Sequence, residues 1–187
     1  MPLPESEVKR ELRHRRTIEC KGYERDDGLW DIDGWLTDIK TYDFPNMDRG
    51  EVKAGEPLHG MGIRVTIDEN MIIHKVIAVT DYSPFSICGN ITPNFNKLEG
   101  LRIGRGFNKA VRELLGGVEG CTHLVDLLGP IATTAFQTLV PRLMAKLRQS
   151  RGGRDRSKPP PTLNTCHAWA SDSAVVRRDF PDHYNGE

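Results

Sequence analysis

Residues 61–67 read MGIRVTI and residues 71–80 read MIIHKVIAVT, with Asp68-Glu69-Asn70 between them. In the first run apolar residues alternate with Gly62, Arg64 and Thr66, which is the period of a strand with one buried face. The second run is rich in β-branched residues, which suit a pleated sheet. The polar residues between the runs favour a turn. These residues therefore predict an antiparallel hairpin.

A second hairpin is predicted earlier in the chain. Residues 17–23 and 29–40 both alternate in polarity, and Asp26-Asp27-Gly28 between them is a turn signal. One face of the second run carries Trp30, Ile32 and Leu36. Residues 43–56 contain Pro45, Gly50, Gly55 and several charges, so we expect a loop there. Four antiparallel strands in sequence indicate one sheet with a single buried face.

Helical periodicity replaces strand periodicity after Pro84. An apolar stripe over residues 107–115 ends at Gly116-Gly117, and a longer stripe covers residues 124–139. Pro130 and Pro141 predict a kink or a break in the longer helix. The fold class is therefore α+β: an antiparallel sheet of about four or more strands, followed by two or more helices packed on one face.

The chain divides by composition into four segments. Residues 1–16 form a charged arm ending in Arg13-His14-Arg15-Arg16, which is either solvated or a clamp for an anion. Residues 17–149 are expected to form a single α+β domain. Residues 150–162 read as a basic linker rich in proline and glycine, and residues 163–187 as a C-terminal tail.

Composition limits the partners and the compartment. The 187 residues carry 26 Lys+Arg and 26 Asp+Glu, so a net charge of zero provides no field to attract nucleic acid or an anionic membrane. The acidic N-terminus lacks an apolar signal segment, and four cysteines without a C-x-x-C pair do not form a disulfide framework. We expect a soluble cytoplasmic protein with a small-molecule substrate, no nucleic acid and no membrane. The sequence leaves open whether it forms a homo-oligomer.

The most informative stretch for chemistry is Gly120-Cys121-Thr122-His123, which follows a helix stop and opens the next helix. With Thr122 as the N-cap, the helix dipole favours the Cys121 thiolate, and His123 projects into the same space. His59 precedes the hairpin at 61–80 and Cys88 follows it, so the hairpin is expected to bring them together. Two thiolates and two imidazoles suit Zn²⁺ or a ferrous ion. The alternative is a buried structural cysteine with a hydrogen-bonding histidine.

The same residues are candidates for catalysis without a metal. The predicted catalytic residues are His59, Cys121, His123 and Tyr82. Tyr82 stands beside Asp81 and could donate a proton, although a tyrosine at a strand end is more often structural. Arg25 and Arg64 could bind a carboxylate of the substrate, or they could form exposed ion pairs of little consequence.

Several motifs of the chain occur together in one known family. Three of them are HRR at residues 14–16, RxDGLWD at residues 25–31 and GCTHL at residues 120–124. This pattern is similar to that of a bacterial family catalogued only as a domain of unknown function. The resemblance implies little chemistry, but some relatives accompany catabolism of aromatic or acyl compounds, which favours a small-molecule enzyme.

Residues 55–140 also resemble, more loosely, the NifU-like iron–sulfur assembly scaffolds. Those scaffolds place one ligand before a hairpin, a cysteine after it, and a His-Cys pair at the start of a later helix. This chain has His59 where a cysteine is expected, and Cys121-Thr122-His123 where His-Cys is expected. Both departures fit a mononuclear metal or an acid–base site better than a cluster, because clusters require thiolates.

Three functions remain as hypotheses from the sequence. The first is a small-molecule enzyme, such as a carbon–carbon lyase acting on an aromatic or acyl compound through a Cys/His site with or without a metal. The second is a metal or iron–sulfur scaffold that passes its ion to a partner. The third is an interaction module with structural thiols.

Overall fold

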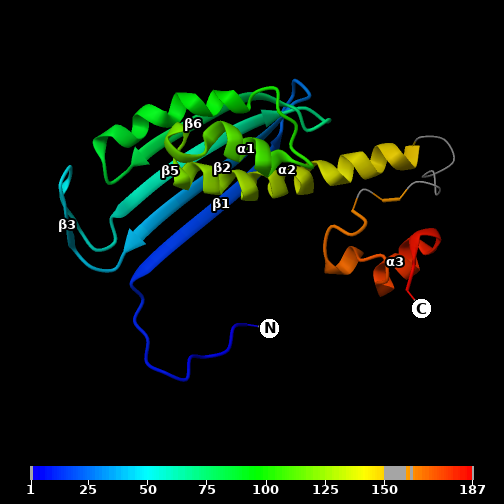
Figure 1. Cartoon of the computed structure of the whole chain (residues 1–187), viewed down its shortest axis with the longest axis horizontal. Helices are drawn as coiled ribbons and strands as arrows, with labels where there is room; N and C mark the ends of the chain where they lie inside the picture. Colours follow the sequence, from blue (N-terminus) through cyan, green and yellow to red (C-terminus); the bar gives the residue numbers. More distant parts are fainter. Residues whose placement is uncertain (1, 150–158, 161, 187) are drawn as a thin grey trace. The chain divides into compact units, whose positions relative to one another are not determined.

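The computed structural model describes residues 2–149, 159–160 and 162–186 (Figure 1). The chain divides into two compact units, Met1–Val140 and Pro141–Glu187, so the division falls within the domain that we predicted to extend to residue 149. Most of the predicted linker, namely residues 150–158 and 161, lies outside the described residues.

A four-stranded antiparallel sheet forms the first unit. Its strands are β1 (His14–Glu24), β2 (Trp30–Lys40), β5 (Pro57–Ile67) and β6 (Ile73–Tyr82), in the order β1-β2-β5-β6. Both predicted hairpins are confirmed, since β1 pairs with β2 and β5 with β6. Strand β1 begins three residues earlier than predicted, so His14 and Arg16 belong to the sheet and not to the N-terminal arm.

Residues 43–56 were predicted as a loop, and that prediction was wrong for six of them. Strands β3 (Phe44–Asn46) and β4 (Gly50–Val52) form a small separate hairpin. The Asn46 side-chain oxygen accepts hydrogen bonds from the backbone of Asp48 and Arg49 and closes the turn. Gly50 supplies the positive φ of 74° that follows. Of the residues that indicated a loop, Pro45 is the middle residue of β3, Gly50 begins β4, and Gly55 lies in the turn after the hairpin.

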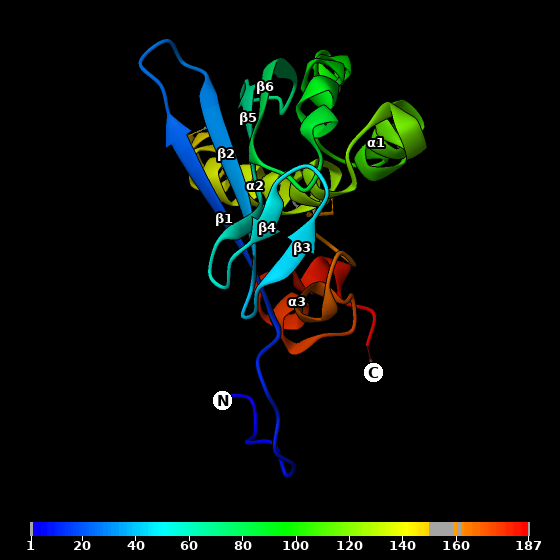
Figure 2. The same ribbon diagram turned by 90° about the vertical axis from the view of Figure 1, so that its left-hand side faces the viewer.

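The helices follow the strands, which confirms the α+β fold. They are the 3₁₀ helices η1 (Ser86–Leu98) and η2 (Gly117–Glu119) and the α-helices α1 (Phe107–Leu115) and α2 (Thr122–Gln149). Figures 1 and 2 show α2 lying along one face of the sheet. Helix α2 continues through Pro130 and Pro141 without a break. Packing of Leu127, Leu128 and Ile131, each at most 1% exposed, holds the helix on both sides of Pro130.

The length and composition of Thr122–Arg142 would also suit a membrane span, with a mean hydropathy of 1.2. The core helix of a folded domain passes the same test, because it needs a continuous apolar stripe. The buried side chains of this stripe are Leu124, Leu127, Leu128, Ile131, Ala135 and Leu139.

The second unit consists of short helices. They are η3 (His167–Trp169), α3 (Ala174–Asp179) and η4 (Pro181–His183). The Ser173 hydroxyl caps α3 by accepting a hydrogen bond from the backbone of Val176, which is fully buried. The rings of Trp169 and Phe180 lie 5.4 Å apart. These contacts order the segment that the sequence predicted as a tail.

Helix α2 approaches the sheet closely at Gly34 in β2. A Cβ atom at this glycine would lie 2.7 Å from Cδ1 of Ile131, closer than side chains pack. We therefore expect Gly34→Val to lower the free energy of unfolding by about 1–3 kcal/mol through overpacking, measured by urea denaturation.

Gly129→Ala is the control on the same helix, at a position away from the contact with β2. A Cβ at this helical position meets no atom within 4 Å, so alanine should leave stability unchanged or raise it by up to about 1 kcal/mol. If Gly34→Val were as stable as the wild type, α2 would not be seated against β2 as described.

Candidate active site

One row of polar side chains crosses three strands on the face that α2 covers. Asp38 continues the buried positions Trp30, Ile32 and Leu36 of β2, and its side chain is 1% exposed. The antiparallel register places Arg16 of β1 on one side of Asp38 and His59 of β5 on the other. The sheet itself therefore fixes this set of side chains.

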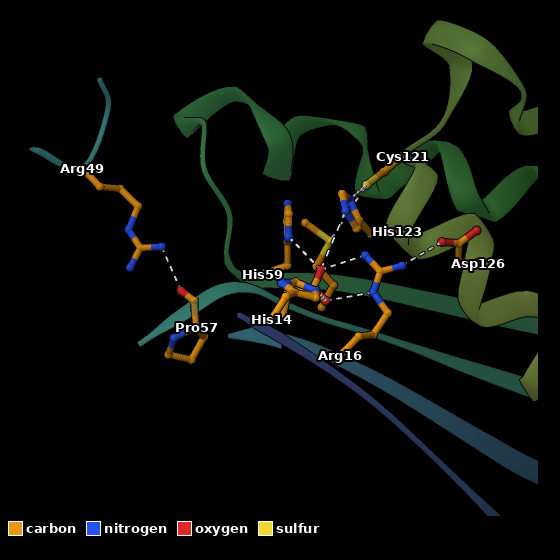
Figure 3. A network of polar contacts seen from close by, with 10 residues as sticks. His14, Arg16, Arg49, Pro57, His59, Cys121, His123 and Asp126 are labelled. Carbon is orange, nitrogen blue, oxygen red and sulfur yellow. Dashed lines mark hydrogen bonds and ion pairs between the residues drawn. The ribbon is translucent and has the colours of Figure 1, made fainter. Parts of the chain in front are cut away.

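The Asp38 carboxylate is the centre of a hydrogen-bond network whose partners His14, Arg16 and His59 are labelled in Figure 3. The Arg16 guanidinium donates from Nε to Oδ1 and from Nη2 to Oδ2, both at 2.8 Å. His14 Nε2 lies 3.1 Å from Oδ1, and His59 Nδ1 lies 3.0 Å from Oδ2. Arg16 also donates to Asp126 on α2 at 3.1 Å. Both carboxylate oxygens are thus occupied, and the network connects the sheet to the helix.

These contacts keep Asp38 ionised although it is buried. Burial alone raises the pKa of a carboxyl group, because it penalises the charged form. The hydrogen bonds and the charge of Arg16, with smaller contributions from His59 and His14, outweigh that effect and lower the pKa of Asp38 to about 2. Asp38 is therefore an acceptor only, at any pH near neutrality.

The imidazole of His59 stacks on that of His123. Their ring centroids lie 3.7 Å apart with an interplanar angle of 29°, and His123 Nε2 is 3.9 Å from Asp38 Oδ2. Burial, followed by the charge of His123, lowers the pKa of His59. Burial, followed by the charge of Arg16, lowers the pKa of His123. Both rings are consequently neutral at pH 7.

The neighbours of His59 also determine which nitrogen carries its proton. Because ionised Asp38 can only accept, Nδ1 of His59 is assigned as the donor of their 3.0 Å hydrogen bond. The lone pair then resides on Nε2. His59 is thus oriented as a base by a buried carboxylate.

Cys121 lies at the border of this group. Its Sγ atom is 3.9 Å from His123 Nδ1 and 3.9 Å from Met61 Sδ. Helix α2 begins at Thr122, and the backbone of Val125 donates to the carbonyl of Cys121 at 2.9 Å, so Cys121 is the N-cap where we predicted Thr122. The thiol contacts His123 but makes no direct contact with Asp38 among those that the described residues show.

The predicted set of four metal ligands is not the set that the fold brings together. Among the described His, Cys, Asp and Glu side chains, the group with ligand atoms within 4.8 Å of one another is Asp38, His59 and His123. Cys88 is separate because β6 ends at Tyr82, opposite Gly60, and the chain continues for several residues before Cys88 in η1. The hairpin brings residue 82, not residue 88, next to the His59 segment.

A metal fits the observed group poorly. Two histidines and a carboxylate are a familiar ligand set. However, both oxygens of Asp38 are already held by Arg16, and Oδ2 also accepts from His59 Nδ1. A cation at Asp38 would have to displace a guanidinium that is hydrogen bonded at 2.8 Å, which is unfavourable electrostatically.

The predicted substrate-binding arginines lie outside this group. Arg25 pairs with Asp27 at 2.6 Å and with Asp31 at 3.2 Å. Arg64 pairs with Asp33 through two contacts of 2.7 Å. These arginines form the exposed ion pairs that were the alternative interpretation.

Tyr82 lies opposite the residue that follows His59, and the described residues show no contact between Tyr82 and His59. It pairs with Gly60 across the sheet and is 47% exposed. Its ring lies 5.9 Å from the guanidinium of Arg49, which donates to the carbonyl of Pro57 (Figure 3). This arrangement is that of a strand-end tyrosine packed beside an arginine.

Sequence reasoning missed Asp38, Arg16 and His14 as members of the site. The missed signal is the spacing of Asp38, which continues the series of buried positions in β2 and is therefore buried itself. A buried carboxylate requires cationic partners. The arginine-rich segment was correctly considered a clamp for an anion, but the anion that His14 and Arg16 hold is Asp38 of the same chain.

The lowered pKa values predict how stability depends on pH. An imidazole with a lowered folded-state pKa binds fewer protons than in the unfolded chain, so stability decreases as pH falls below about 6.5. Asp38 adds stability above its ordinary pKa of 3.8 that is lost as pH falls towards about 2. We expect the free energy of unfolding, measured in urea between pH 8 and 5, to decrease more steeply in the wild type than in His59→Gln. A wild type that became more stable relative to His59→Gln as pH falls would contradict this assignment.

Comparison with known proteins identifies a family for the chain but no activity. No curated protein and no solved structure matches it, so the resemblance to NifU-like scaffolds stays a prediction. A family model described as "Protein of unknown function (DUF2889)" matches residues 14–137. That span begins at His14 and includes Asp38, His59, His123 and Asp126, so the whole network falls within the family domain. The motif resemblance is thereby confirmed, and the chain belongs to the DUF2889 family of proteins of unknown function.

Proposed function

We propose that this protein is a small-molecule enzyme that uses acid–base catalysis at His59 and His123. The observation that carries the proposal is the buried hydrogen bond between Asp38 and His59 Nδ1 at 3.0 Å. This bond leaves Nε2 of the neutral imidazole without a proton, and the charged Asp38 carboxylate holds the ring in one orientation. A general base requires this arrangement, because its ring must be neutral and oriented before it accepts a proton.

Asp38 assists His59 in two ways. It fixes the ring and the tautomer before any substrate arrives, and it stabilises the imidazolium that forms when His59 accepts a proton. The lowered pKa of His59 keeps the ring neutral near pH 7, as a base must be before it accepts a proton. A positioned base of this kind contributes roughly 10²–10⁴-fold to a rate.

His123 supplies the complementary function. Because the two rings lie 3.7 Å apart, a positive charge on one imidazole disfavours a positive charge on the other. The pair therefore holds at most one proton beyond those of the two neutral rings. The His123 side chain is 26% exposed against 10% for His59, so His123 exchanges protons with solvent more readily. The pair can therefore take up one substrate proton and give the same proton back, from His59 or through His123.

Carbon–carbon bond cleavage is the reaction class that we assign to this pair. His59 takes the proton of a substrate hydroxyl, a carbonyl forms at that carbon, and the adjacent carbon–carbon bond breaks. The electron pair passes to a carbon stabilised by an aromatic ring or an acyl group, and the proton that His59 took up is returned to that carbon, either from His59 or through His123. The step balances without an oxidant, a reductant or a metal. The aromatic or acyl substrate follows from the family resemblance.

The test is a lyase assay on a panel of hydroxylated aromatic and acyl compounds, with the released carbonyl product measured by derivatisation and chromatography. We expect His59→Gln to fold and to lose about 10²–10⁴-fold in kcat, since glutamine cannot take up a proton. His74→Gln is the matched control, because His74 is an exposed histidine paired with Asp68. A folded His59→Gln variant with wild-type turnover would contradict the proposal that His59 is the base.

Cys121→Ser separates acid–base from covalent catalysis. The thiol contacts His123 Nδ1 only at 3.9 Å, so under the proposal serine should retain kcat within about tenfold of the wild type. Loss of all turnover in folded Cys121→Ser protein, with a covalent adduct visible in the wild type by mass spectrometry, would show that Cys121 is the nucleophile and replace this mechanism.

The alternative of a metal or iron–sulfur scaffold is distinguished by elemental analysis of untagged protein. The proximity of Asp38, His59 and His123 favours a metal, while the fork of Arg16 on Asp38 opposes it. One equivalent of zinc or iron that disappears in His59→Gln would favour the metal site. Acid–base catalysis predicts full activity after dialysis against a chelator.

A further inference from the structure

The face of the sheet opposite α2 carries a patch of apolar and charged side chains. Alternation along the strands directs these residues away from the buried face. We define the outer patch as Glu19, Lys21, Asp33, Trp35, Arg64, Ile77 and Val79. They line a shallow groove of about 370 Å³. We propose that the outer patch is the interface of a symmetric homodimer, in which it packs against the outer patch of a second copy of this chain.

The patch contains three exposed apolar side chains, not a single isolated one. Trp35, Ile77 and Val79 are 37%, 43% and 40% exposed, and they come from two strands that flank β5. The Trp35 ring lies against Gly62, the residue opposite it in the register, so the indole is supported by the sheet and presents its other face outward. Tryptophan held in this way is the typical anchor of an interface between proteins.

The charges of the patch fit a copy of itself better than a strongly charged partner. Glu19 pairs with Lys21 at 3.0 Å, and Asp33 pairs with Arg64 at 2.7 Å, so positive and negative groups alternate and sum to zero. A two-fold axis can place each positive group opposite a negative group of the other copy. A polyanion or a polycation would find as much repulsion as attraction on this surface.

The area available is also that of a dimer interface. Four strands spaced about 4.8 Å apart, with about ten residues of roughly 3.3 Å each, give an outer face on the order of 600 Å². Stable interfaces bury about 800 Å² of accessible surface on each partner. The accessible surface of a sheet face is larger than its flat area. Two sheets packed face to face about 10 Å apart would therefore suffice without the helices or the acid–base site.

The experiment is sedimentation velocity and light scattering of the full chain over a range of micromolar concentrations. We expect the wild type to sediment with twice the chain mass of 21.1 kDa. Trp35→Glu, and independently Ile77→Glu, should place a carboxylate in the apolar centre of both copies and weaken dimerisation at least about tenfold. Val118→Glu is the matched control, because Val118 is 91% exposed on η2 and lies outside the patch. Far-ultraviolet circular dichroism verifies that each variant folds.

Charge reversal tests the electrostatic part separately. Arg64→Asp places a second carboxylate beside Asp33 and removes a positive group from the patch of both copies, so it should weaken the dimer. The exchange Asp33→Arg with Arg64→Asp should restore it. A wild type that is monomeric throughout the concentration range overturns the proposal. Folded Trp35→Glu and Ile77→Glu variants that stay dimeric also overturn it, and would indicate pairing through another surface, such as the edge strand β1.

Discussion

The contact on which the rest of the site depends is the pairing of the buried Asp38 carboxylate with the Arg16 guanidinium. Two parallel hydrogen bonds of 2.8 Å join them across β1 and β2. Arg16 extends the pairing to α2 through Asp126, so one charged contact connects the edge strand, the central strand and the long helix. Removing one partner of a buried pair typically costs about 3–5 kcal/mol, because the other charge is left without compensation. The contact between Asp38 and Arg16 therefore stabilises the fold and also keeps the Asp38 carboxylate ionised.

The chemistry of the site follows from that pairing. Arg16 keeps Asp38 ionised, ionised Asp38 fixes the proton of His59 on Nδ1, and Nε2 of His59 is left as a base. The approach of α2 to the sheet then determines where His123 lies. Gly34 permits this close approach, because any side chain at that position would meet Ile131. Packing on β2 and the proposed catalysis at His59 on β5 are therefore connected through the position of one helix.

The sequence predicted the fold well because period and face are local properties. Alternation in residues 61–67 and 30–36 was sufficient for the two hairpins and for their buried face. The order of the four strands comes from the structure. The topology of the second hairpin and the helix start at residue 122 also placed His59 and His123 in one region, where their rings stack. Cys88 was placed with them wrongly, because hairpin topology does not determine where the chain runs after β6.

Asp38 escaped prediction for a physical reason. A carboxylate is ordinarily a surface residue, so it was not considered a member of the buried face, although its spacing from Leu36 requires that position. Its burial is stable only because residues more than twenty positions away supply the compensating charges, and such pairing depends on strand register. The hairpin at residues 44–52 was missed because its turn-forming residues favour a loop and each of its two strands has only three residues.

The most direct measurement of the central claim is the tautomeric state of His59, obtained from long-range ¹⁵N–¹H correlation spectra of imidazole-labelled protein near pH 8. If ionised Asp38 orients His59 as described, the spectrum will show the neutral ring with its proton on Nδ1 and an unprotonated Nε2. The Asp38→Asn variant will lose that preference. A wild-type His59 protonated on Nε2, or one that exchanges rapidly between both tautomers, would contradict the account.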